Sequence, residues 1–317
     1  MAGEDEGRAT GIAAVVARVE ARVTPIVDRV LATPIGSLGV DVMDRYGAAG
    51  GGVTAAGLAY SLIFAIVPTM LILVSLLGFF ITDPAELDRL VNLLVAQFPP
   101  LEPIVTEILK QVSAGAWTFS FLGFIGLFWG ASRSYAALDS SVALYFPREP
   151  RRDIVRQTVE SIVSVLFFLG SAIGGVAVLW WVADLSVIPS GSGDALLRRL
   201  VGVLLVTLWM CTVMVLVYRF VPARHVRWRE AAVPALVAGV TLSGLTQVFA
   251  IVTPIFFKSL RLYGAFVALF AALIWLSLCT QIVLIGVAWL ARRVGAPKPE
   301  KPAATAAAGE RPGEPGS

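Results

Sequence analysis

The chain has 317 residues, of which 57% are hydrophobic and 15% are charged, and its formal net charge is +3. Soluble domains average about 45–50% apolar and about 25% charged residues, so this composition excludes an ordinary soluble globular protein. The small net charge argues against a nucleic-acid partner, because binding to phosphates needs a strong basic surplus. The apolar residues are concentrated in long runs, which is the pattern of an integral membrane protein.

The N-terminal stretch is expected to stay outside the bilayer core. Residues 1–10 are polar and acidic, so we expect them to be disordered, and they contain no apolar run typical of a cleavable secretion signal. Within 11–46, apolar residues recur at helical spacing and predict amphipathic juxtamembrane helices, the last of them at about 35–46. The first of these helices carries a row of arginines that would face either anionic lipid headgroups or the protein's own cytoplasmic surface: Arg18, Arg22 and Arg29.

Six long apolar runs follow, and each is long enough to cross the roughly 30 Å hydrocarbon core as a helix. The predicted spans lie at about 55–80, 117–146, 161–183, 200–218, 231–255 and 262–291. They form a transmembrane domain over 47–293, so the predicted fold class is an all-α integral membrane protein with a six-transmembrane-helix bundle. The tail at 294–317 is rich in Pro, Ala and Gly and is expected to be disordered.

Glycines and prolines are expected to interrupt the helices. Gly50–Gly52 predict a flexible joint before the first span. Pro68 removes a backbone hydrogen bond near the middle of that span, so a kink is predicted there, and Pro254 is expected to cost the fifth span its last turn. Pro99 and Pro100 separate two short amphipathic helices between the first two spans, which we expect on the extracytoplasmic side.

The basic residues predict the orientation, because Lys and Arg concentrate on the cytoplasmic side of membrane proteins. With six spans both termini lie on one face, and this face carries eighteen of the 25 Lys and Arg residues, against six on the other face. We therefore expect both termini to be cytoplasmic. The one remaining basic residue, Arg133, lies within the second span.

The second span carries Arg133 and Asp139, whereas the other five spans contain no Asp, Glu, Lys or Arg. An ionised side chain in hydrocarbon costs at least about 2.5–3.5 kcal/mol, so it needs a partner, water or the interface. We expect a polar cavity open to the cytoplasm, in which Arg133 receives a phosphate or carboxylate group. The alternative is that Arg133 snorkels to the interface, or bonds to backbone carbonyls, and only stabilises the bundle. Further candidates for the cavity are Tyr60, Ser61, Tyr135, Thr280 and Gln281.

Other features of the spans and loops favour packing or topology over ligand binding. Four glycines permit close approach of helices: Gly123, Gly126, Gly170 and Gly174. Both cysteines, Cys211 and Cys279, lie in apolar runs and are expected to be core residues rather than a disulfide or metal pair. Three arginines of the loop before the fifth span either bind anionic lipid headgroups or simply follow from the topology: Arg224, Arg227 and Arg229.

The sequence lacks the arrangements typical of enzymes. Its one histidine, His225, lies among arginines in a loop, and there is no HExxH, GxSxG or Gly-rich phosphate-binding motif. A two-metal nuclease site would need several converging carboxylates, and the spans contain one. We therefore expect no enzymatic activity, no cofactor and no bound metal.

Four segments occur in an order and spacing that match a known family. They are A-A-G-L-A-Y-S-L-I-F-A-I-V-P-T-M-L-I-L (55–73), L-F-W-G-A-S-R-S-Y-A-A-L-D (127–139), Y-R-F-V-P-A-R-H-V-R-W-R-E-A (218–231) and Y-G-A-F-V-A-L-F-A-A-L-I-W-L (263–276). The chain thus resembles the YihY / virulence factor BrkB family. The resemblance implies a six-helix protein of the bacterial inner membrane, and the residues above do not support an old ribonuclease label of that family.

Two functions from different classes fit the sequence. A transporter or flippase for an amphiphilic or anionic substrate of the envelope-lipid type is favoured by Arg133, by Pro68 and by the polar groups on three spans. The alternative is a non-transporting membrane scaffold for envelope assembly, favoured by the amphipathic helices, which offer docking surfaces; a nuclease is disfavoured. The expected partners are the lipid bilayer and an anionic lipid or amphiphile, with no nucleic acid, and the sequence does not predict the oligomeric state.

Overall fold

The computed structural model describes residues 33–64, 132–146, 192–222, 226–259 and 264–299, together with isolated positions, most of them between 163 and 182. All regular elements in this described part of the chain are helical. The chain divides into two compact units, 1–45 and 46–317, which are treated separately. Several expectations lie outside the described residues: those for Arg18, Arg22, Arg29, Pro68, Pro99, Pro100, Gly123, Gly126 and the tail beyond Pro299.

Helix α2 (Pro34–Ala48) lies over the stretch in which a short helix is expected. Thr33 caps the helix, because its hydroxyl oxygen accepts a hydrogen bond at 3.1 Å from the backbone N–H three residues further on. Pro34 occupies the first helical position, where a missing N–H loses no helical hydrogen bond. Asp41 and Arg45 form an ion pair one turn apart, with 3.3 Å between Oδ2 and Nε.

A sharp break separates α2 from the next helix, Gly51–Phe64, and the chain bends by 66° there. Gly50 adopts a φ of 64°, a conformation that residues with a side chain rarely adopt. Gly51 lies so close to the ring of Tyr46 that an added Cβ would overlap it. The expected glycine joint is therefore a defined turn at Gly50, and the helix beyond it begins directly at Gly51.

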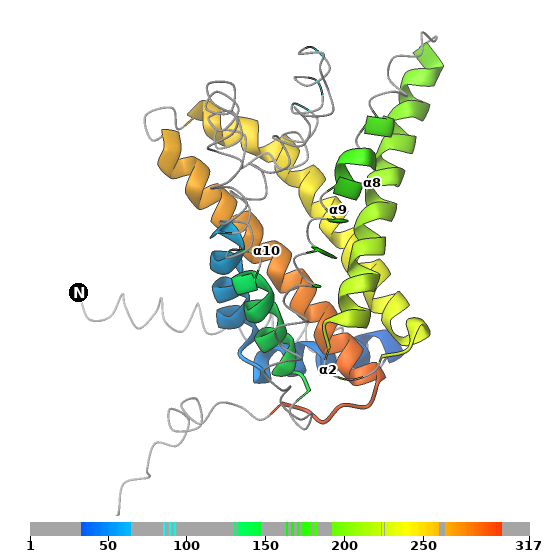
Figure 1. The fold of residues 1–317 in the computed structure, drawn as a ribbon, viewed down its shortest axis with the longest axis vertical. Coiled ribbons are helices and arrows are strands. Elements are labelled where there is room, and N and C mark those ends of the chain that lie inside the picture. The colour runs from blue at the N-terminus through cyan, green and yellow to red at the C-terminus, as the bar shows by residue number, and fades with distance from the viewer. Residues whose placement is uncertain are drawn as a thin grey trace, which may run out of the picture. The chain divides into compact units, whose positions relative to one another are not determined.

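Within the described ranges, three helices are long and apolar enough to cross a membrane (Figure 1). They are α8 (Ser192–Phe220), α9 (Trp228–Ser259) and α10 (Gly264–Arg293). α8 and α9 contain the spans predicted at 200–218 and 231–255, and α10 covers the span predicted at 262–291 from Gly264 on. The expected loss of the last turn at Pro254 is not seen, because α9 continues through this residue to Ser259.

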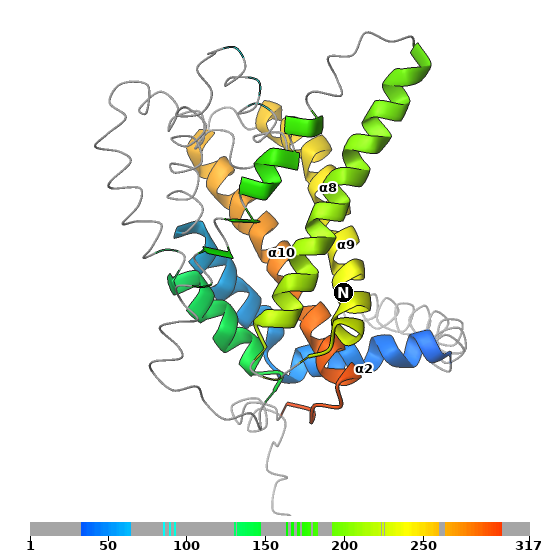
Figure 2. The same ribbon diagram turned by 45° about the vertical axis from the view of Figure 1, so that its right-hand side comes forward.

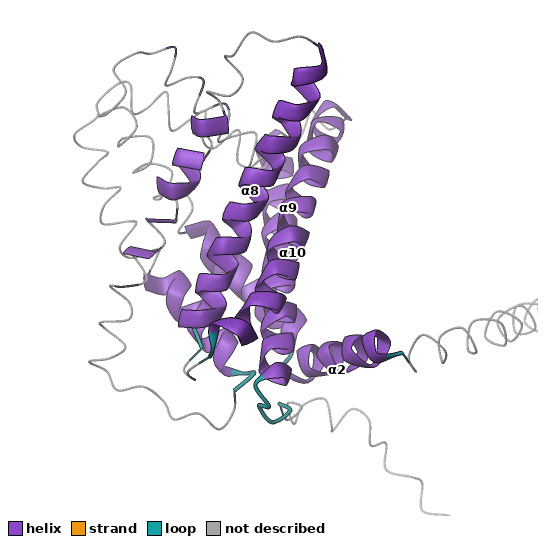
Figure 3. Cartoon of the chain, turned by 90° about the vertical axis from the view of Figure 1, so that its right-hand side faces the viewer, coloured by secondary structure: helices purple, strands orange, loops and turns teal. Residues whose placement is uncertain are grey.

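The remaining predicted spans are described in part. The helix Gly51–Phe64 forms the start of the first one, and with α2 it would count as a fourth candidate span. Residues 132–143 and 173–178 are helical and lie within the second and third predicted spans. The described part of the chain is therefore an all-helical membrane protein with three to four candidate spans (Figure 3).

Helix α9 packs against both α8 and α10, whereas α8 and α10 meet over a short stretch only (Figures 1 and 2). An added Cβ at Gly239 of α9 would lie 2.6 Å from the Cα of Cys211 on α8. Beside this contact the hydroxyl oxygens of Thr207 and Ser243 are 2.7 Å apart. The two helices thus meet through small and hydroxyl-bearing residues, the kind of packing that associates helices in lipid.

The described residues of the third predicted span contact α8. Gly174 lies so close to the indole of Trp209 that an added Cβ would overlap it, and Val182 lies 3.0 Å from the place of a Cβ on Gly202. Gly170, the partner of Gly174 in the expected glycine pair, meets no neighbour within 4 Å in this way. Close packing is therefore present at Gly174 and not at Gly170.

Candidate functional site

The helix at 51–64 accepts hydrogen bonds from two hydroxyl groups, one of the predicted site residue Thr280 and one of Ser134, which was not predicted. Thr280 of α10 donates a hydrogen bond from its hydroxyl to the carbonyl oxygen of Ala55 at 2.8 Å. Ser134 donates one to the carbonyl oxygen of Ser61 at 3.0 Å. Thr280 is 2% exposed and Ser134 1% exposed. The first predicted span is therefore joined to the second and to the sixth by two buried hydroxyl-to-carbonyl bonds.

An apolar cluster fills the contact between these helices. Ala59 is buried against Trp275 and Leu276 of α10. Leu245 and Phe249 of α9 pack against the same cluster. Because the surroundings are apolar, a hydroxyl buried here gains from a carbonyl partner and would lose free energy without one.

Arg133 directly precedes Ser134, so its backbone lies at the depth of Ser61. Its side chain is exposed, whereas those of Ser134 and Tyr135 are buried. The helix ends at Ala143, ten residues further on, which corresponds to about 15 Å at 1.5 Å per residue. The Arg133 side chain is therefore exposed about ten residues before the end of the described helix at Ala143.

The other predicted residues have different surroundings. Tyr60 is 61% exposed, and its ring meets that of Phe64 edge-on, with the centroids 5.0 Å apart. The amide Nε2 of Gln281 lies 3.4 Å from the Oγ of Ser277, one turn earlier on the same helix, which is a weak hydrogen bond. Asp139 is half-buried. The structure thus gives Tyr60 and Gln281 neighbours on their own helices.

Sequence reasoning missed the link between α8 and α10. The hydroxyl of Tyr218, a buried residue, donates to the carbonyl oxygen of Val283 at 2.8 Å. Gly286 makes room for it, since an added Cβ there would overlap the Tyr218 hydroxyl. A signal was available, because Tyr218 begins one of the four family-like segments and a glycine in a spanning helix often marks a close approach.

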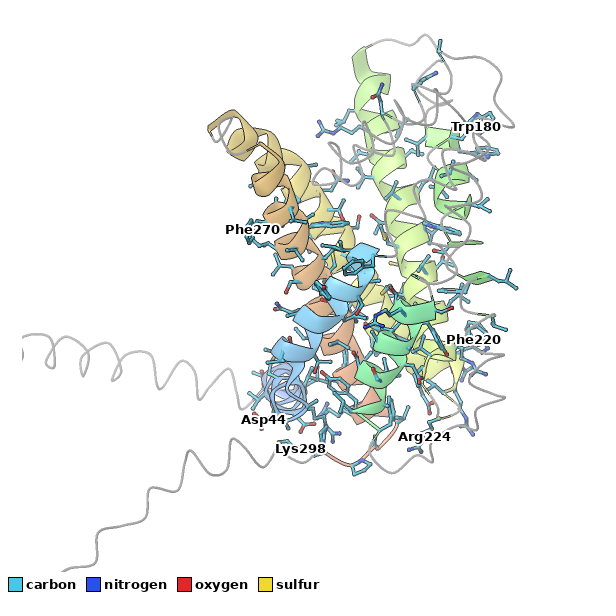
Figure 4. All side chains as sticks on the ribbon, turned by 60° about the vertical axis from the view of Figure 1, so that its left-hand side comes forward. Asp44, Trp180, Phe220, Arg224, Phe270 and Lys298 are labelled. Atoms are coloured by element: carbon cyan, nitrogen blue, oxygen red, sulfur yellow. The ribbon has the colours of Figure 1, made fainter. Side chains whose placement is uncertain are left out.

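The three arginines of the loop before α9, Arg224, Arg227 and Arg229, are exposed. Figure 4 shows Arg224 at the end of the bundle where Phe220 lies, with Trp180 toward the opposite end. Within the described ranges, no group of three or more His, Cys, Asp or Glu side chains could hold a metal ion. Both cysteines are free thiols, and Cys211 is buried.

Residues 42–308 match the family described as virulence factor BrkB. A UPF0761 membrane protein of Rhodospirillum rubrum is 30% identical over 247 residues, which cover 73% of this chain and 53% of the relative. One of Chromohalobacter salexigens is 26% identical over 261 residues, covering 80% of this chain and 63% of the relative. One of Photobacterium profundum is 24% identical over 238 residues, covering 74% and 73%.

The chain thus spans between about half and two thirds of the length of the first two of these relatives. No solved structure matches it. The family match extends over most of the chain, the relatives are named membrane proteins of bacteria, and three of the described helices are apolar enough to cross a bilayer. This chain is therefore a bacterial membrane protein that belongs to the BrkB family.

Proposed function

We propose that the chain is a transporter or flippase of the bacterial inner membrane, and that it moves an amphiphilic or anionic substrate past Arg133. The observation that supports this best is the exposed Arg133 side chain, which lies about 15 Å before the helix ends at Ala143, in a stretch predicted to span the bilayer. Facing hydrocarbon, an arginine would cost at least about 2.5–3.5 kcal/mol. Water or an anionic group in a polar cavity open to the cytoplasm removes that cost.

The chemistry of the guanidinium group suits an anionic headgroup. Its planar set of N–H donors binds the oxygens of a phosphate or carboxylate in pairs. Asp139 lies six residues further along the same helix, about 9 Å toward its end, and is half-buried. In this proposal the anionic group of the substrate passes Arg133, while its apolar chains stay in the bilayer.

The helix at 51–64 is the element that we propose to move during transport. Ser134 and Thr280 hold it through one inter-helix hydrogen bond each, and such a neutral bond contributes only about 0.5–1.5 kcal/mol. The break at Gly50 separates it from α2. Besides the apolar contact of Ala59 with Trp275 and Leu276, the helix is held to its neighbours by weak bonds, and such bonds can exchange partners at small cost, as hinged transitions require.

The test is translocation by the purified full-length protein in vesicles that contain a fluorescent phosphatidylglycerol, with a fluorescent phosphatidylcholine as the reference lipid. Arg133→Ala is expected to lower the phosphatidylglycerol rate by about tenfold or more, the equivalent of about 1.4 kcal/mol or more, and Arg133→Lys to retain part of it. Ser140→Ala is the matched control, because Ser140 is exposed on the same helix and, among the described residues, bonds to the carbonyl of Ala137 alone.

Folding is checked for every variant by its melting temperature in detergent. A folded Arg133→Ala protein that moves phosphatidylglycerol at the wild-type rate would contradict the proposal. A wild-type protein that moves neither lipid faster than empty vesicles would contradict it as well.

A scaffold function for envelope assembly is the second candidate, and α2 favours it. Val40 and Met43 are exposed on this helix, and exposed apolar side chains on an amphipathic helix offer a docking surface. This function requires no Arg133. It would be supported if Val40→Ser with Met43→Ser released a stoichiometric partner while Arg133→Ala did not.

A further inference from the structure

Two aromatic residues and an arginine form a cluster where α8 ends and α9 begins. Phe220 is the last residue of α8 and Trp228 the first of α9, and their rings meet edge-on with the centroids 6.2 Å apart. The guanidinium carbon of Arg219 lies 5.6 Å from the Phe220 centroid and 5.7 Å from the Trp228 centroid. Both distances fit a cation–π contact, so the cluster fixes a positive charge between two aromatic rings.

The two rings in this cluster are open to the surroundings. Phe220 is 61% and Trp228 53% exposed. They are also the residues at which the apolar stretches Arg199–Phe220 and Trp228–Val252 end and begin. Aromatic residues at such boundaries lie at the level of the lipid headgroups. The cluster is therefore at the surface of the bilayer and not in its core.

Both ends of the loop between the two helices are held by contacts. Val221 and Val226 are buried, and the N–H of Val221 bonds to the carbonyl oxygen of Val217 at 2.9 Å. The backbone N–H of Arg227 bonds to the Glu230 carboxylate at 2.9 Å, in the manner of a capping box. The backbone is therefore fixed at both ends of the loop, at Val221 and at Arg227.

Positive charge is the third feature of this region, which we call the arginine-rich corner and which consists of Arg219, Phe220, Arg224, Arg227, Trp228 and Arg229. Arg224, Arg227 and Arg229 are exposed, and none of them forms an ion pair within the described part of the chain. The nearby carboxylate of Glu230 accepts the Arg227 backbone bond. Among the described residues of 219–230 there are thus four arginines, one of them against the two exposed rings, and one carboxylate, that of Glu230.

We propose that this corner is a binding site for the headgroup of an anionic phospholipid. The phosphate would lie against the guanidinium groups of the loop, and the upper part of the acyl chains would lie against Phe220 and Trp228. The site is independent of the proposed transport route, because it includes neither Arg133 nor the helix at 51–64. It would hold a lipid that stays bound and anchors this end of the bundle.

The experiment measures lipid association with the full-length protein in phosphatidylcholine vesicles, by electron paramagnetic resonance of spin-labelled phosphatidylglycerol against spin-labelled phosphatidylcholine. The wild type is expected to prefer phosphatidylglycerol by about fivefold or more, since each basic residue at the surface contributes about a factor of five. The triple variant Arg224→Gln, Arg227→Gln, Arg229→Gln should abolish the preference. A wild type without preference overturns the proposal.

Two further sets of variants distinguish a specific lipid site from a general attraction by positive surface charge. The triple variant Arg224→Lys, Arg227→Lys, Arg229→Lys keeps every positive charge but loses the paired N–H donors of the guanidinium groups. Its preference for phosphatidylglycerol should therefore fall at least about twofold. An unchanged preference overturns the site. Arg229→Gln should weaken the preference, whereas Arg293→Gln, at the exposed end of α10, should not. Equal loss in these two variants overturns the site as well.

The source of the phosphate group is tested by competition. Inorganic phosphate at a concentration above that of the labelled lipid should not displace it, because the rings contribute only when acyl chains are present. Full displacement by inorganic phosphate would overturn the assignment to a lipid. Phe220→Leu with Trp228→Leu should lower the association of phosphatidylglycerol while the melting temperature stays within a few degrees of the wild type.

Discussion

Tyr218 of α8 donates its phenolic hydrogen to the carbonyl oxygen of Val283 on α10, with 2.8 Å between the two oxygens. The two helices otherwise meet little, because α9 packs against each of them. Tyr218 is buried, so this bond replaces the water that the phenol loses on folding. One side chain thus joins the first and the last of the three long helices directly.

Tyr218→Phe should destabilise the protein by about 0.5–1.5 kcal/mol, because the bond is lost while the ring still fills its place. The measurement is the melting temperature of the purified protein in detergent, followed by tryptophan fluorescence. Tyr60→Phe is the matched control, since Tyr60 is 61% exposed and is not buried between helices as Tyr218 is. Equal shifts in the two variants would contradict the assignment.

Gly286→Ala should cost about 1–3 kcal/mol, because the added Cβ overlaps the hydroxyl of Tyr218. Tyr218→Phe removes the overlapping oxygen, so the double variant should be less destabilised than the sum of the single ones. Gly244→Ala is the control, since a Cβ at Gly244 meets nothing within 4 Å. Additive effects in the double variant would show that the Tyr218 hydroxyl does not set the requirement for glycine.

Gly239→Ala should be more damaging than Gly286→Ala. The added Cβ would lie 2.6 Å from the Cα and 2.8 Å from the backbone nitrogen of Cys211. Because these are backbone atoms, the overlap can be relieved only if α8 or α9 moves as a whole. Cys211→Ala should therefore not rescue the variant, although the sulfur is also only 2.7 Å away. The yield of monodisperse protein on size-exclusion chromatography tests this, and a well-folded Gly239→Ala protein would contradict it.

The spans over α8, α9 and α10 could be predicted from the sequence because each contains an uninterrupted apolar run. Their ends were less predictable. Helix α8 begins at Ser192 and α9 ends at Ser259, outside the predicted 200–218 and 231–255. The backbone of a helix continues its hydrogen bonds past the last apolar residue, and a proline such as Pro254 removes only one of them.

The contacts of the candidate site could not be predicted from the sequence. The rise per residue predicts similar depths for Ser61 and Thr280, and the structure shows that Thr280 bonds to Ala55 on the helix that carries Ser61. Which side chain faces a neighbour depends on the rotation of each helix, and no sequence period gives that for an apolar helix without an amphipathic stripe. For this reason Ser134 was overlooked, although it follows Arg133 directly.

Thr280→Val and Ser134→Ala should each loosen the helix at 51–64, because each removes one of its two hydroxyl bonds. The expected loss is about 0.5–1.5 kcal/mol per variant. Hydrogen exchange by mass spectrometry should show faster exchange in peptides from 51–64. Thr212→Val is the control, since the hydroxyl of Thr212 bonds only to the carbonyl of Leu208 on its own helix. Exchange that rises equally throughout the chain would contradict a local role.

The predicted orientation can be tested with single cysteines in a background without Cys211 and Cys279. Leu196 is exposed on α8 before the apolar stretch that begins at Arg199, and Arg224 is exposed beyond its far end. At 1.5 Å per residue the apolar stretch between them is about 33 Å long, enough to separate two faces of a bilayer. Because most basic residues lie on the face of Arg224, that face should be cytoplasmic.

A membrane-impermeant maleimide is added to cells that lack the outer membrane and have an intact inner membrane. It should label the Leu196→Cys variant. It should label the Arg224→Cys variant only after the inner membrane is opened. Arg293→Cys, at the exposed end of α10, should behave like Arg224→Cys, because an antiparallel α9 lies between the two helices. The reverse labelling would invert the topology and place the arginine-rich corner and the entrance of the proposed cavity outside the cytoplasm. Labelling of both ends from one side would mean that α8 does not cross the membrane.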